Sequence, residues 1–242
     1  MKNFKFASSA LATAMLATTI AAPSVAQAEV SASVGISNFY LWRGVDLSND
    51  GASNSSAPAI SGDLNISSDW GGYAGIWASS GDENLGQEYD LYFGWGGEFG
   101  DFSVDVSYWT YVYPSNSEVV FADIDGFSVP LGEVDAPIDP GDVADLVIGL
   151  GYAGVGFTVY ENLEDDGAGA RYVTLDYSFG DFNALVGSHD IGEETFEHLQ
   201  FSYSYNDDLT FTVSKFLDDD VDSLGFPFND DVLFNVYYGI SF

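Results

Sequence analysis

The sequence predicts an all-β fold: an antiparallel transmembrane β-barrel of about 12 strands, with short periplasmic turns and longer acidic extracellular loops. Three observations predict it. Large apolar residues alternate with small or polar residues in a series of segments, as they do in strands with two different faces. The connections between these segments are alternately short and long. The last segment is an apolar ladder that ends on Phe242.

The first five expected strands carry mainly Ser, Gly, Asp or Asn on one face and large apolar residues on the other. In the first, one face carries Val30, Ala32, Val34, Ile36, Tyr40 and Trp42 and is expected to point outward, and the other carries Ser31, Ser33, Gly35 and Ser37. The fourth is the clearest, because bulky apolar residues take every second position from Tyr89 to Trp95. A tight turn at Gly100 leads into the fifth. These strands are expected at 30–43, 58–69, 73–80, 87–97 and 102–113.

The remaining strands are paired by short turns rich in Gly, Asn and Asp, which hairpins require. The turns are expected at 153–154, 180–181 and 206–208. The strands are expected at 143–152, 155–163, 171–179, 182–189, 197–205, 209–217 and 232–242. An even number of strands places both termini on the periplasmic side.

The longer connections lie at 44–57, 81–86, 114–142, 164–170, 190–196 and 218–231. Most of them are acidic, and transmembrane barrels show this asymmetry between periplasmic turns and extracellular loops. A soluble β-sandwich is the alternative. Its apolar face would form the core, but here the opposite face is so rich in Gly and Ser that it would leave half of each sheet thin.

The last expected strand carries large apolar residues at every second position. They are Val232, Phe234, Val236, Tyr238, Ile240 and Phe242. In a membrane barrel this strand pairs with the first and faces lipid. We therefore expect Tyr238, Ile240 and Phe242 to form a C-terminal signal for the barrel-assembly machinery.

Residues 1–28 have the features of a signal peptide. Lys2 and Lys5 precede an apolar run at 7–22, and Ala26-Gln27-Ala28 offers a cleavage site. The alternative, a retained anchor, fits less well because the run is short and rich in Ala and Thr. We expect two parts, a signal peptide at 1–28 and a β-barrel at 29–242.

The chain is strongly acidic, with 38 Asp and Glu residues, 5 Lys and Arg residues and a formal net charge of −33. Nucleic-acid binding requires a basic surface, so this composition excludes it. The chain has no cysteine, which excludes disulfides and thiolate metal sites. An acidic surface suited to a salty environment and a functional acidic field both remain open.

Four stretches resemble a known family. They are YLWRGV at 40–45, GYAGIWAS at 72–79, EYDLY at 88–92 and GEFGDF at 97–102. Over about residues 30–113 the chain resembles the TorF-family porins, a largely uncharacterised family of outer-membrane proteins of Gram-negative bacteria. The resemblance implies the cell outer membrane as the location, after signal-peptide cleavage, and a pore-like role. It implies no particular binding residue.

Arg43 has the strand phase of the small lumen-facing residues, so we expect it to point into the lumen. The acids with lumen phase are Asp63, Glu88, Asp90, Asp105, Asp145 and Asp176. We expect Arg43 to pair with an acid on a neighbouring strand. Two interpretations remain open, a charged constriction that sorts ions and an internal salt bridge that braces the barrel.

Arg171 and Lys215 have the opposite phase and lie at the extracellular ends of their strands. We expect them to point outward at the rim and to bind lipopolysaccharide phosphates. A solvated position without a partner is the alternative.

The lumen phase also carries bulky side chains, and filling of a narrow barrel is favoured over a slide for sugars or aromatic solutes. They are Tyr92, Trp109, Tyr111, Tyr113, Tyr160, Tyr172 and Tyr237. Acidic clusters in the expected loops offer weak oxygen ligands for loosely bound Ca²⁺ or Mg²⁺. These candidates are Asp123, Asp125, Asp218, Asp219 and Asp220. No resident cofactor is expected.

The leading hypothesis is a porin-like channel for passive diffusion of small solutes, with a preference for cations, and not an enzyme. Its expected partners are outer-membrane lipid, lipopolysaccharide, the barrel-assembly machinery and small solutes. The alternative is a plugged structural or surface-interaction barrel whose acidic loops bind divalent cations or a partner. A third hypothesis is an outer-membrane hydrolase that uses His189 or His198. Ser188-His189-Asp190 is not itself a triad, because neighbours on a strand point to opposite faces.

Overall fold

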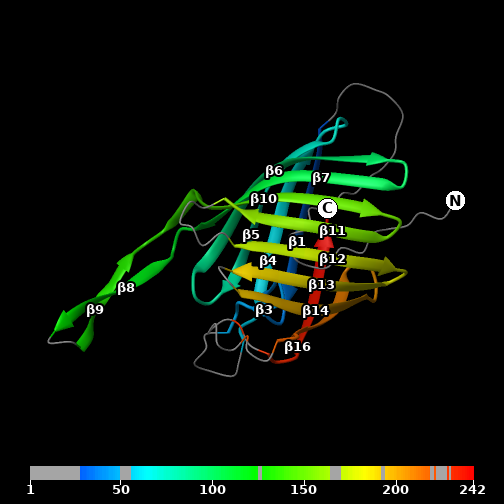
Figure 1. Cartoon of the computed structure of the whole chain (residues 1–242). Coiled ribbons are helices and arrows are strands. Elements are labelled where there is room, and N and C mark those ends of the chain that lie inside the picture. Colours follow the sequence, from blue (N-terminus) through cyan, green and yellow to red (C-terminus); the bar gives the residue numbers. More distant parts are fainter. Residues whose placement is uncertain are drawn as a thin grey trace.

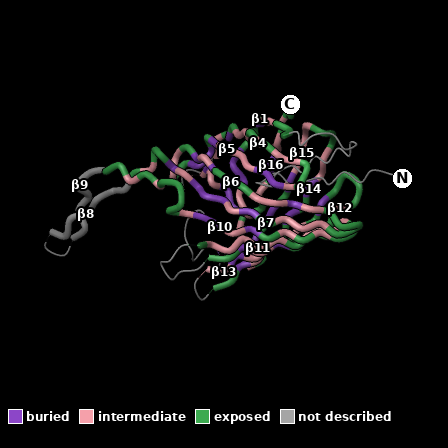
Figure 2. Tube along the Cα trace, turned by 90° about the horizontal axis from the view of Figure 1, so that it is seen from above, coloured by how far each residue is buried: buried purple, intermediate pink, exposed green. Residues whose placement is uncertain are grey.

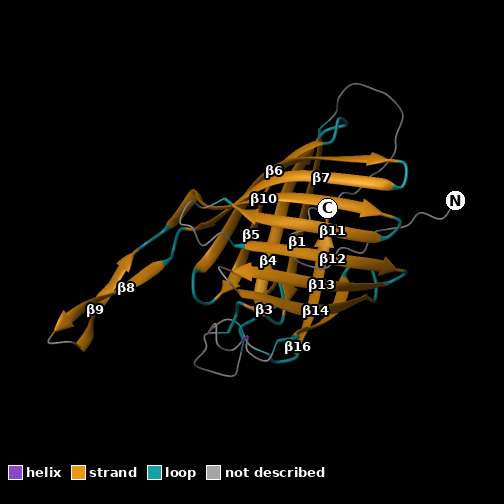
Figure 3. Ribbon diagram, in the orientation of Figure 1, coloured by secondary structure: helices purple, strands orange, loops and turns teal. Residues whose placement is uncertain are grey.

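A closed antiparallel barrel dominates the computed structural model, which describes residues 28–49, 56–124, 127–163, 170–191, 194–218, 221, 228 and 230–242, without the side chains of 118–133. Figures 1 and 3 show the strands of the barrel. Its strands are β1 Glu29–Ser37, β4 Ala59–Ser67, β5 Gly72–Asp82, β6 Gly86–Phe99, β7 Phe102–Tyr113, β10 Ile138–Tyr152, β11 Val155–Asn162, β12 Arg171–Phe179, β13 Phe182–Ile191, β14 Glu194–Ser204, β15 Leu209–Phe216 and β16 Leu233–Ser241. The predicted fold class is confirmed, and each predicted strand has its counterpart. Among the described residues, no helix is long and apolar enough to cross a membrane.

The barrel closes where β1 pairs with β16. Their antiparallel register runs from Ser33 opposite Ser241 to Ser37 opposite Tyr237. The N–H of Phe242 also donates to the carbonyl of Ala32, with N and O 2.8 Å apart. Among the described strands, closure pairs each wall strand with a neighbour on both sides, as a barrel in lipid requires.

The two ends of the barrel differ. One, which we call the short-turn end, carries the turns at 68–71, 100–101, 153–154, 180–181 and 205–208 together with the start of β1 and the end of β16. The other, the long-loop end, carries the longer connections. Positive φ angles at Gly71, Gly100 and Gly154 fit these tight turns, because glycine adopts them without a steric penalty.

The outer surface is apolar, because every second residue of the strands points away from the lumen. Figure 2 shows this alternation of exposed and less exposed residues. The exposed side chains include Ile60, Leu64, Ile76, Leu91, Phe93, Leu150, Leu175, Leu199 and Phe234. Tyr238, Ile240 and Phe242 belong to this surface. A soluble protein rarely exposes so much contiguous apolar area.

Aromatic rings gather on the outer surface near the short-turn end. Phe102 and Tyr152 stack with centroids 4.4 Å apart. Phe182 stacks on Tyr203 at 4.9 Å and on Phe201 at 5.6 Å. Aromatic girdles of this kind lie at the membrane interfaces of transmembrane barrels.

The first strand is shorter than predicted, which corrects the expected range of 30–43. β1 ends at Ser37, and the chain then forms a small hairpin from β2 Leu41–Trp42 and β3 Val45–Asp46. Arg43 and Gly44 form its tip with φ angles of 48° and 88°, which a tight two-residue hairpin turn requires. The predicted outward position of Tyr40 is therefore wrong, because Tyr40 is buried.

The expected loop at 114–142 contains a second hairpin, so its assignment as one long loop was wrong. β8 Ser117–Ile124 pairs with β9 Phe127–Asp135. Figures 1 and 3 show this hairpin extending away from the barrel rather than folding into it. At its base, the N–H of Ala136 donates to the carbonyl of Asn116 (3.0 Å), and Asn116 Nδ2 donates to the carbonyl of Ala136 (2.9 Å).

Candidate functional site

The hairpin of residues 38–48, which we call the inner hairpin, lies inside the long-loop end of the barrel. Leu41, Val45 and Tyr40 are at most 5 % exposed. Val45 packs in a cluster with Phe196 of β14, Phe216 of β15 and Val221, with Leu47 and Phe228 against it. An apolar face that is covered on several sides stabilises the hairpin in this position.

Hydrogen bonds attach the inner hairpin to two parts of the wall. Ser48 Oγ donates to the carbonyl of Gly81 on β5 (2.8 Å), and Asn235 Nδ2 of β16 donates to the carbonyl of Phe39 (2.8 Å). The N–H of Ser48 donates to Asp46 Oδ1 at 2.9 Å, and Ser56 Oγ donates to the same carboxylate. Burial raises the pKa of Asp46 above its ordinary value, although both hydrogen bonds act in the opposite direction.

Arg43 extends from the tip of the inner hairpin to the far wall. Its Nη2 donates to Asp145 Oδ2 on β10 at 2.7 Å and to the hydroxyl of Tyr111 on β7 at 3.1 Å. Tyr111 also donates to Asp145 Oδ2 at 2.9 Å. This arrangement satisfies a buried carboxylate with a charge-assisted hydrogen bond and a neutral one.

Three rings surround the Arg43 guanidinium. Its carbon lies 4.5 Å from the ring centroid of Trp42, 4.4 Å from Tyr160 and 5.2 Å from Tyr172. Cation–π attraction is strongest where the cation is shielded from water, and the Arg43 side chain is 13 % exposed. Arg43 therefore points into the lumen, as the sequence predicts. Its acid partner, however, lies on β10, whereas β1 pairs with β4 and β16.

Both histidines pack against the tip of the inner hairpin. His189 Nε2 donates to the carbonyl of Arg43 at 2.7 Å. A Cβ atom on Gly44 would lie 2.7 Å from Cγ of His198, so only glycine fits here without a shift. His198 is fully buried, with Nε2 2.8 Å from the hydroxyl of Tyr172 and Nδ1 3.5 Å from Ser214 Oγ. These contacts place both rings in the packing of the lumen. The hydrolase hypothesis stays a prediction.

The predicted lumen acids all lie inside the barrel, in two groups. Glu88, Asp90 and Asp145 are buried near the inner hairpin. Asp63, Asp105 and Asp176 are half-buried and lie farther from the long-loop end. The second group accepts hydrogen bonds from Ser33, from Tyr73 (2.7 Å) and Ser107 (3.1 Å), and from Asn183 (3.0 Å), respectively.

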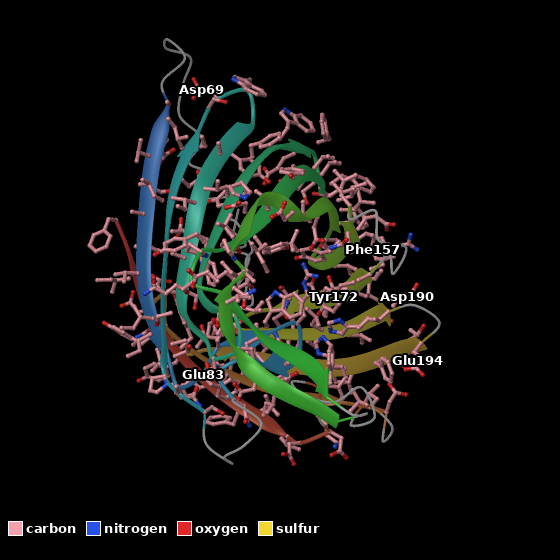
Figure 4. The ribbon with its side chains drawn as sticks, turned by 90° about the vertical axis from the view of Figure 1, so that its left-hand side faces the viewer. Asp69, Glu83, Phe157, Tyr172, Asp190 and Glu194 are labelled. Carbon is pink, nitrogen blue, oxygen red and sulfur yellow. The ribbon has the colours of Figure 1, made fainter. Side chains whose placement is uncertain are left out.

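Aromatic side chains fill much of the lumen beside the inner hairpin. The rings of Tyr92 and Trp109 stack with centroids 4.2 Å apart. They belong to a buried cluster with Tyr73, Tyr111, Tyr113 and Val147. Figure 4 looks into the barrel from the side of the β8–β9 hairpin, with Tyr172 inside and Phe157 on the outer wall. This packing favours filling over an open slide for solutes.

Arg171 and Lys215 lie on the outer face at the long-loop end. Arg171 forms two hydrogen bonds with the carboxylate of Glu161, at 2.5 and 2.9 Å. Lys215 Nζ donates to the carbonyl of Asp230 at 2.6 Å, and the Asp230 carboxylate is 3.8 Å away. Both basic residues therefore have an acidic neighbour, and all four side chains are nearly half exposed. Their predicted contact with lipopolysaccharide stays a prediction.

Most residues of the acidic loop clusters lie outside the part of the chain that the structure describes. Asp125, Asp219 and Asp220 lie outside the described residues, and the side chain of Asp123 is not described. Asp218 Oδ2 accepts a hydrogen bond from the N–H of Glu197 at 2.9 Å. In the described part of the chain, no three His, Asp or Glu residues come together as a metal site.

The inner hairpin is the part of the candidate site that the sequence did not predict. Tyr40 and Trp42 have the strand phase of Val34 and Ile36, so the pattern predicts a single strand up to Arg43. Length gave no clear signal, because β6 and β10 of the wall have 14 and 15 residues.

Several solved structures show a weak likeness to this chain. The chain and the KdgM porin have a TM-score of 0.42 and 6% identity over 89% of this chain and 98% of the porin. A loop-deletion variant of OmpT, an outer membrane protein of Vibrio cholerae, has a TM-score of 0.36 and 9% identity over 90% and 100% of the two chains. For outer membrane phospholipase A from Escherichia coli the values are 0.38 and 12% over 87% and 88%. All three likenesses are weak.

Sequence comparison identifies the family. No curated protein matches the chain. The family model described as "Bacterial protein of unknown function (Gcw_chp)" matches residues 21–230. The TorF-family name stays a prediction from the four motifs. The chain belongs to the Gcw_chp family of bacterial proteins.

Proposed function

We propose that this protein is a porin-like channel of the bacterial outer membrane that passes small cations, with the inner hairpin as its constriction. The observation that carries the proposal is the charge of the lumen inside a barrel with an apolar exterior. Six inward-facing carboxylates line it, at positions 63, 88, 90, 105, 145 and 176. Among the described residues, Arg43 is the one Lys or Arg that faces them, and Asp145 pairs with it.

A membrane setting is supported by the outer surface. The exposed side chains on the wall are large and aliphatic, and aromatic rings collect near the short-turn end. Closure through β1 and β16 leaves no open edge. Lipid tolerates strands only when all their backbone groups are paired within such a barrel. The predicted signal peptide supplies the route of export.

The half-buried acids support the cation preference. Asp63, Asp105 and Asp176 are bonded to neutral groups, namely serine, tyrosine and asparagine side chains. Their negative charge is therefore not offset by an ion pair in these contacts. A low-dielectric wall focuses such a field along the lumen, so the lumen should attract cations and repel anions, more strongly at low salt.

The second candidate is a plugged barrel with a structural or surface-interaction role. The observation that favours it is the tight packing of the inner hairpin, in which Val45 is 1 % exposed and Arg43 reaches the far wall. A channel of this geometry conducts weakly unless the hairpin moves.

Single-channel recording in planar bilayers under a salt gradient tests the proposal. We expect small stepwise currents whose reversal potential has the sign of cation flow. A variant in which residues 39–48 are replaced by a Gly-Ser linker should show larger steps with the same sign. The matched control removes the β8–β9 hairpin, which lies outside the barrel, and should conduct like the wild type. Silence of the folded wild type together with silence of the linker variant would reject the channel in favour of the plugged barrel.

A further inference from the structure

We propose that Glu88 and Asp90 form a binding site for a hard divalent cation in the lumen beside the inner hairpin. Both residues belong to β6, two positions apart, so their side chains point to the same side of the wall. Both are buried, at 1 % and 2 % exposure. The proposal concerns binding and goes beyond conduction, so it holds whether or not current passes through the barrel.

The two carboxylates have unsatisfied oxygens. Among the described residues, Glu88 Oε2 and Asp90 Oδ1 are buried and accept no hydrogen bond. Buried polar atoms are rarely left in this condition, and a buried carboxylate is costly unless a proton, a base or a metal ion compensates it. These two oxygens lie on adjacent inward positions of one strand, which is the arrangement that a shared cation would satisfy.

Arg43 forms its ion pair and hydrogen bonds with Asp145 and Tyr111 rather than with this pair. Its charge reaches Asp90, but the charge of Glu88 acts on Asp90 more strongly. The strand neighbours of Asp90 are Trp77 on β5 and Tyr111 on β7, and Glu88 lies opposite Ser79 on β5. None of these neighbours is basic.

Neutral oxygens near Glu88 can complete a coordination shell. The side chains of Tyr113, Tyr40 and Asp90 lie within interacting reach of Glu88, and the charge of Asp82 also acts on it. Calcium takes six to eight oxygen ligands, from carboxylates, neutral oxygens and water. Because the site has two carboxylates and no third one in coordinating position, we expect modest affinity, with a Kd of about 10⁻⁴ to 10⁻³ M.

A cation at this position would also hold the inner hairpin. Tyr40 belongs to the hairpin and interacts electrostatically with Glu88 on the wall. The backbone N–H of Tyr40 donates to Ser48 Oγ at 2.7 Å, and Ser48 Oγ in turn donates to the carbonyl of Gly81 on β5. Cation binding therefore couples the carboxylate pair to the position of the hairpin.

Terbium luminescence tests the site in the full protein purified in detergent, because Tb³⁺ replaces Ca²⁺ at oxygen sites and is excited by nearby aromatic rings. We expect a saturable signal from the wild type that Ca²⁺ displaces. Glu88→Gln and Asp90→Asn should each weaken binding by about tenfold or more. Asp176→Asn, which changes a lumen acid of the other group, is the matched control and should bind like the wild type.

A second pair of variants locates the ion without altering a carboxylate. Trp77 lies opposite Asp90, whereas Trp70 lies in an exposed turn at the short-turn end. Trp77→Phe should lower the tryptophan-excited signal, and Trp70→Phe should not. No saturable signal in the wild type would overturn the proposal and leave the pair to share a proton. A signal that survives Glu88→Gln and Asp90→Asn, or that ignores Trp77→Phe, would overturn it in favour of ions bound at the acidic loops.

Discussion

Arg43 joins two parts of the lumen that would otherwise separate, the inner hairpin and the wall formed by β7 and β10. Arg43→Met keeps much of the side-chain volume but leaves Asp145 buried without its base. Removing one partner of a buried ion pair typically costs about 3–5 kcal/mol. We expect the free energy of unfolding to fall by about this amount. Urea unfolding in detergent, followed by tryptophan fluorescence, measures it.

The control for this loss is Lys215→Met on the outer rim. Lys215 and Asp230 are nearly half exposed, and exposed pairs contribute about 0–1 kcal/mol. Asp145→Asn in the Arg43→Met background should recover part of the lost stability, because the unpaired charge is then removed. An equal effect of Arg43→Met and Lys215→Met would contradict the central position of Arg43.

Alanine substitutions at Gly44 and Gly100 distinguish the cost of an unfavourable backbone conformation from the cost of steric overlap. Both have positive φ, 88° and 69°. A Cβ on Gly100 would meet no atom within 4 Å, whereas one on Gly44 would press on His198 at 2.7 Å. Gly100→Ala should therefore cost about 1–2 kcal/mol from backbone conformation alone.

Gly44→Ala should cost about 1–3 kcal/mol more than Gly100→Ala, because the lumen must also admit a methyl group. Urea unfolding of the two variants beside the wild type gives the difference directly. Equal losses would mean that the ring of His198 moves aside without penalty, and that the inner hairpin is loosely packed.

For single residues, the sequence predicts the face of the strand on which a side chain lies, but it does not predict the residues that the side chain contacts. Strand phase alone places Asp63, Glu88 and Asp145 in the lumen, because the pleat fixes the side on which each residue points. It carries no information about which residues meet across the lumen. The contacts of Arg43 come from β2, β7, β10, β11 and β12, and such pairings depend on tertiary packing that no local pattern encodes.

Among the elements, the two extra hairpins have different relations to the barrel. The inner hairpin is tied to β5, β10, β13 and β16 by hydrogen bonds. The β8–β9 hairpin continues from β7 and β10 and leaves the barrel (Figure 1). Both segments contain consecutive apolar residues, at 39–42 and 119–122, so period-two alternation did not identify either hairpin.

The base of the β8–β9 hairpin suggests that it can be removed. Asn116 and Ala136 are already joined by two hydrogen bonds, so an Asn-Gly turn in place of residues 117–135 should close the chain without strain. We expect the free energy of unfolding to change by no more than about 0.5 kcal/mol. Heat-modifiable migration on gels and urea unfolding measure it. Failure of this variant to fold would mean that the hairpin contributes to the barrel.

For the whole molecule, closure of the barrel and the electrostatic field in its lumen depend on different properties of the sequence. Closure needs strands that alternate in phase and turns that return each strand beside the last, and both are local features that the sequence displays. The electrostatic field inside depends on where the acids lie along the axis. The half-buried acids lie toward the short-turn end of the lumen, whereas the buried ones are packed around the inner hairpin.

This division predicts which acids govern selectivity. Asp63→Asn, Asp105→Asn and Asp176→Asn combined remove three charges whose hydrogen-bond partners are neutral, so the lumen should lose most of its attraction for cations. The reversal potential under a salt gradient should move toward zero, and the difference from the wild type should grow as the salt concentration falls, because salt screens charges over about 10 Å at 0.1 M. Asp69→Asn, in an exposed turn at the short-turn end, is the matched control and should leave the reversal potential near its wild-type value. An unchanged reversal potential in the triple variant would assign selectivity to the buried acids at the inner hairpin, because ions would then meet the decisive charge at the constriction rather than along the open wall.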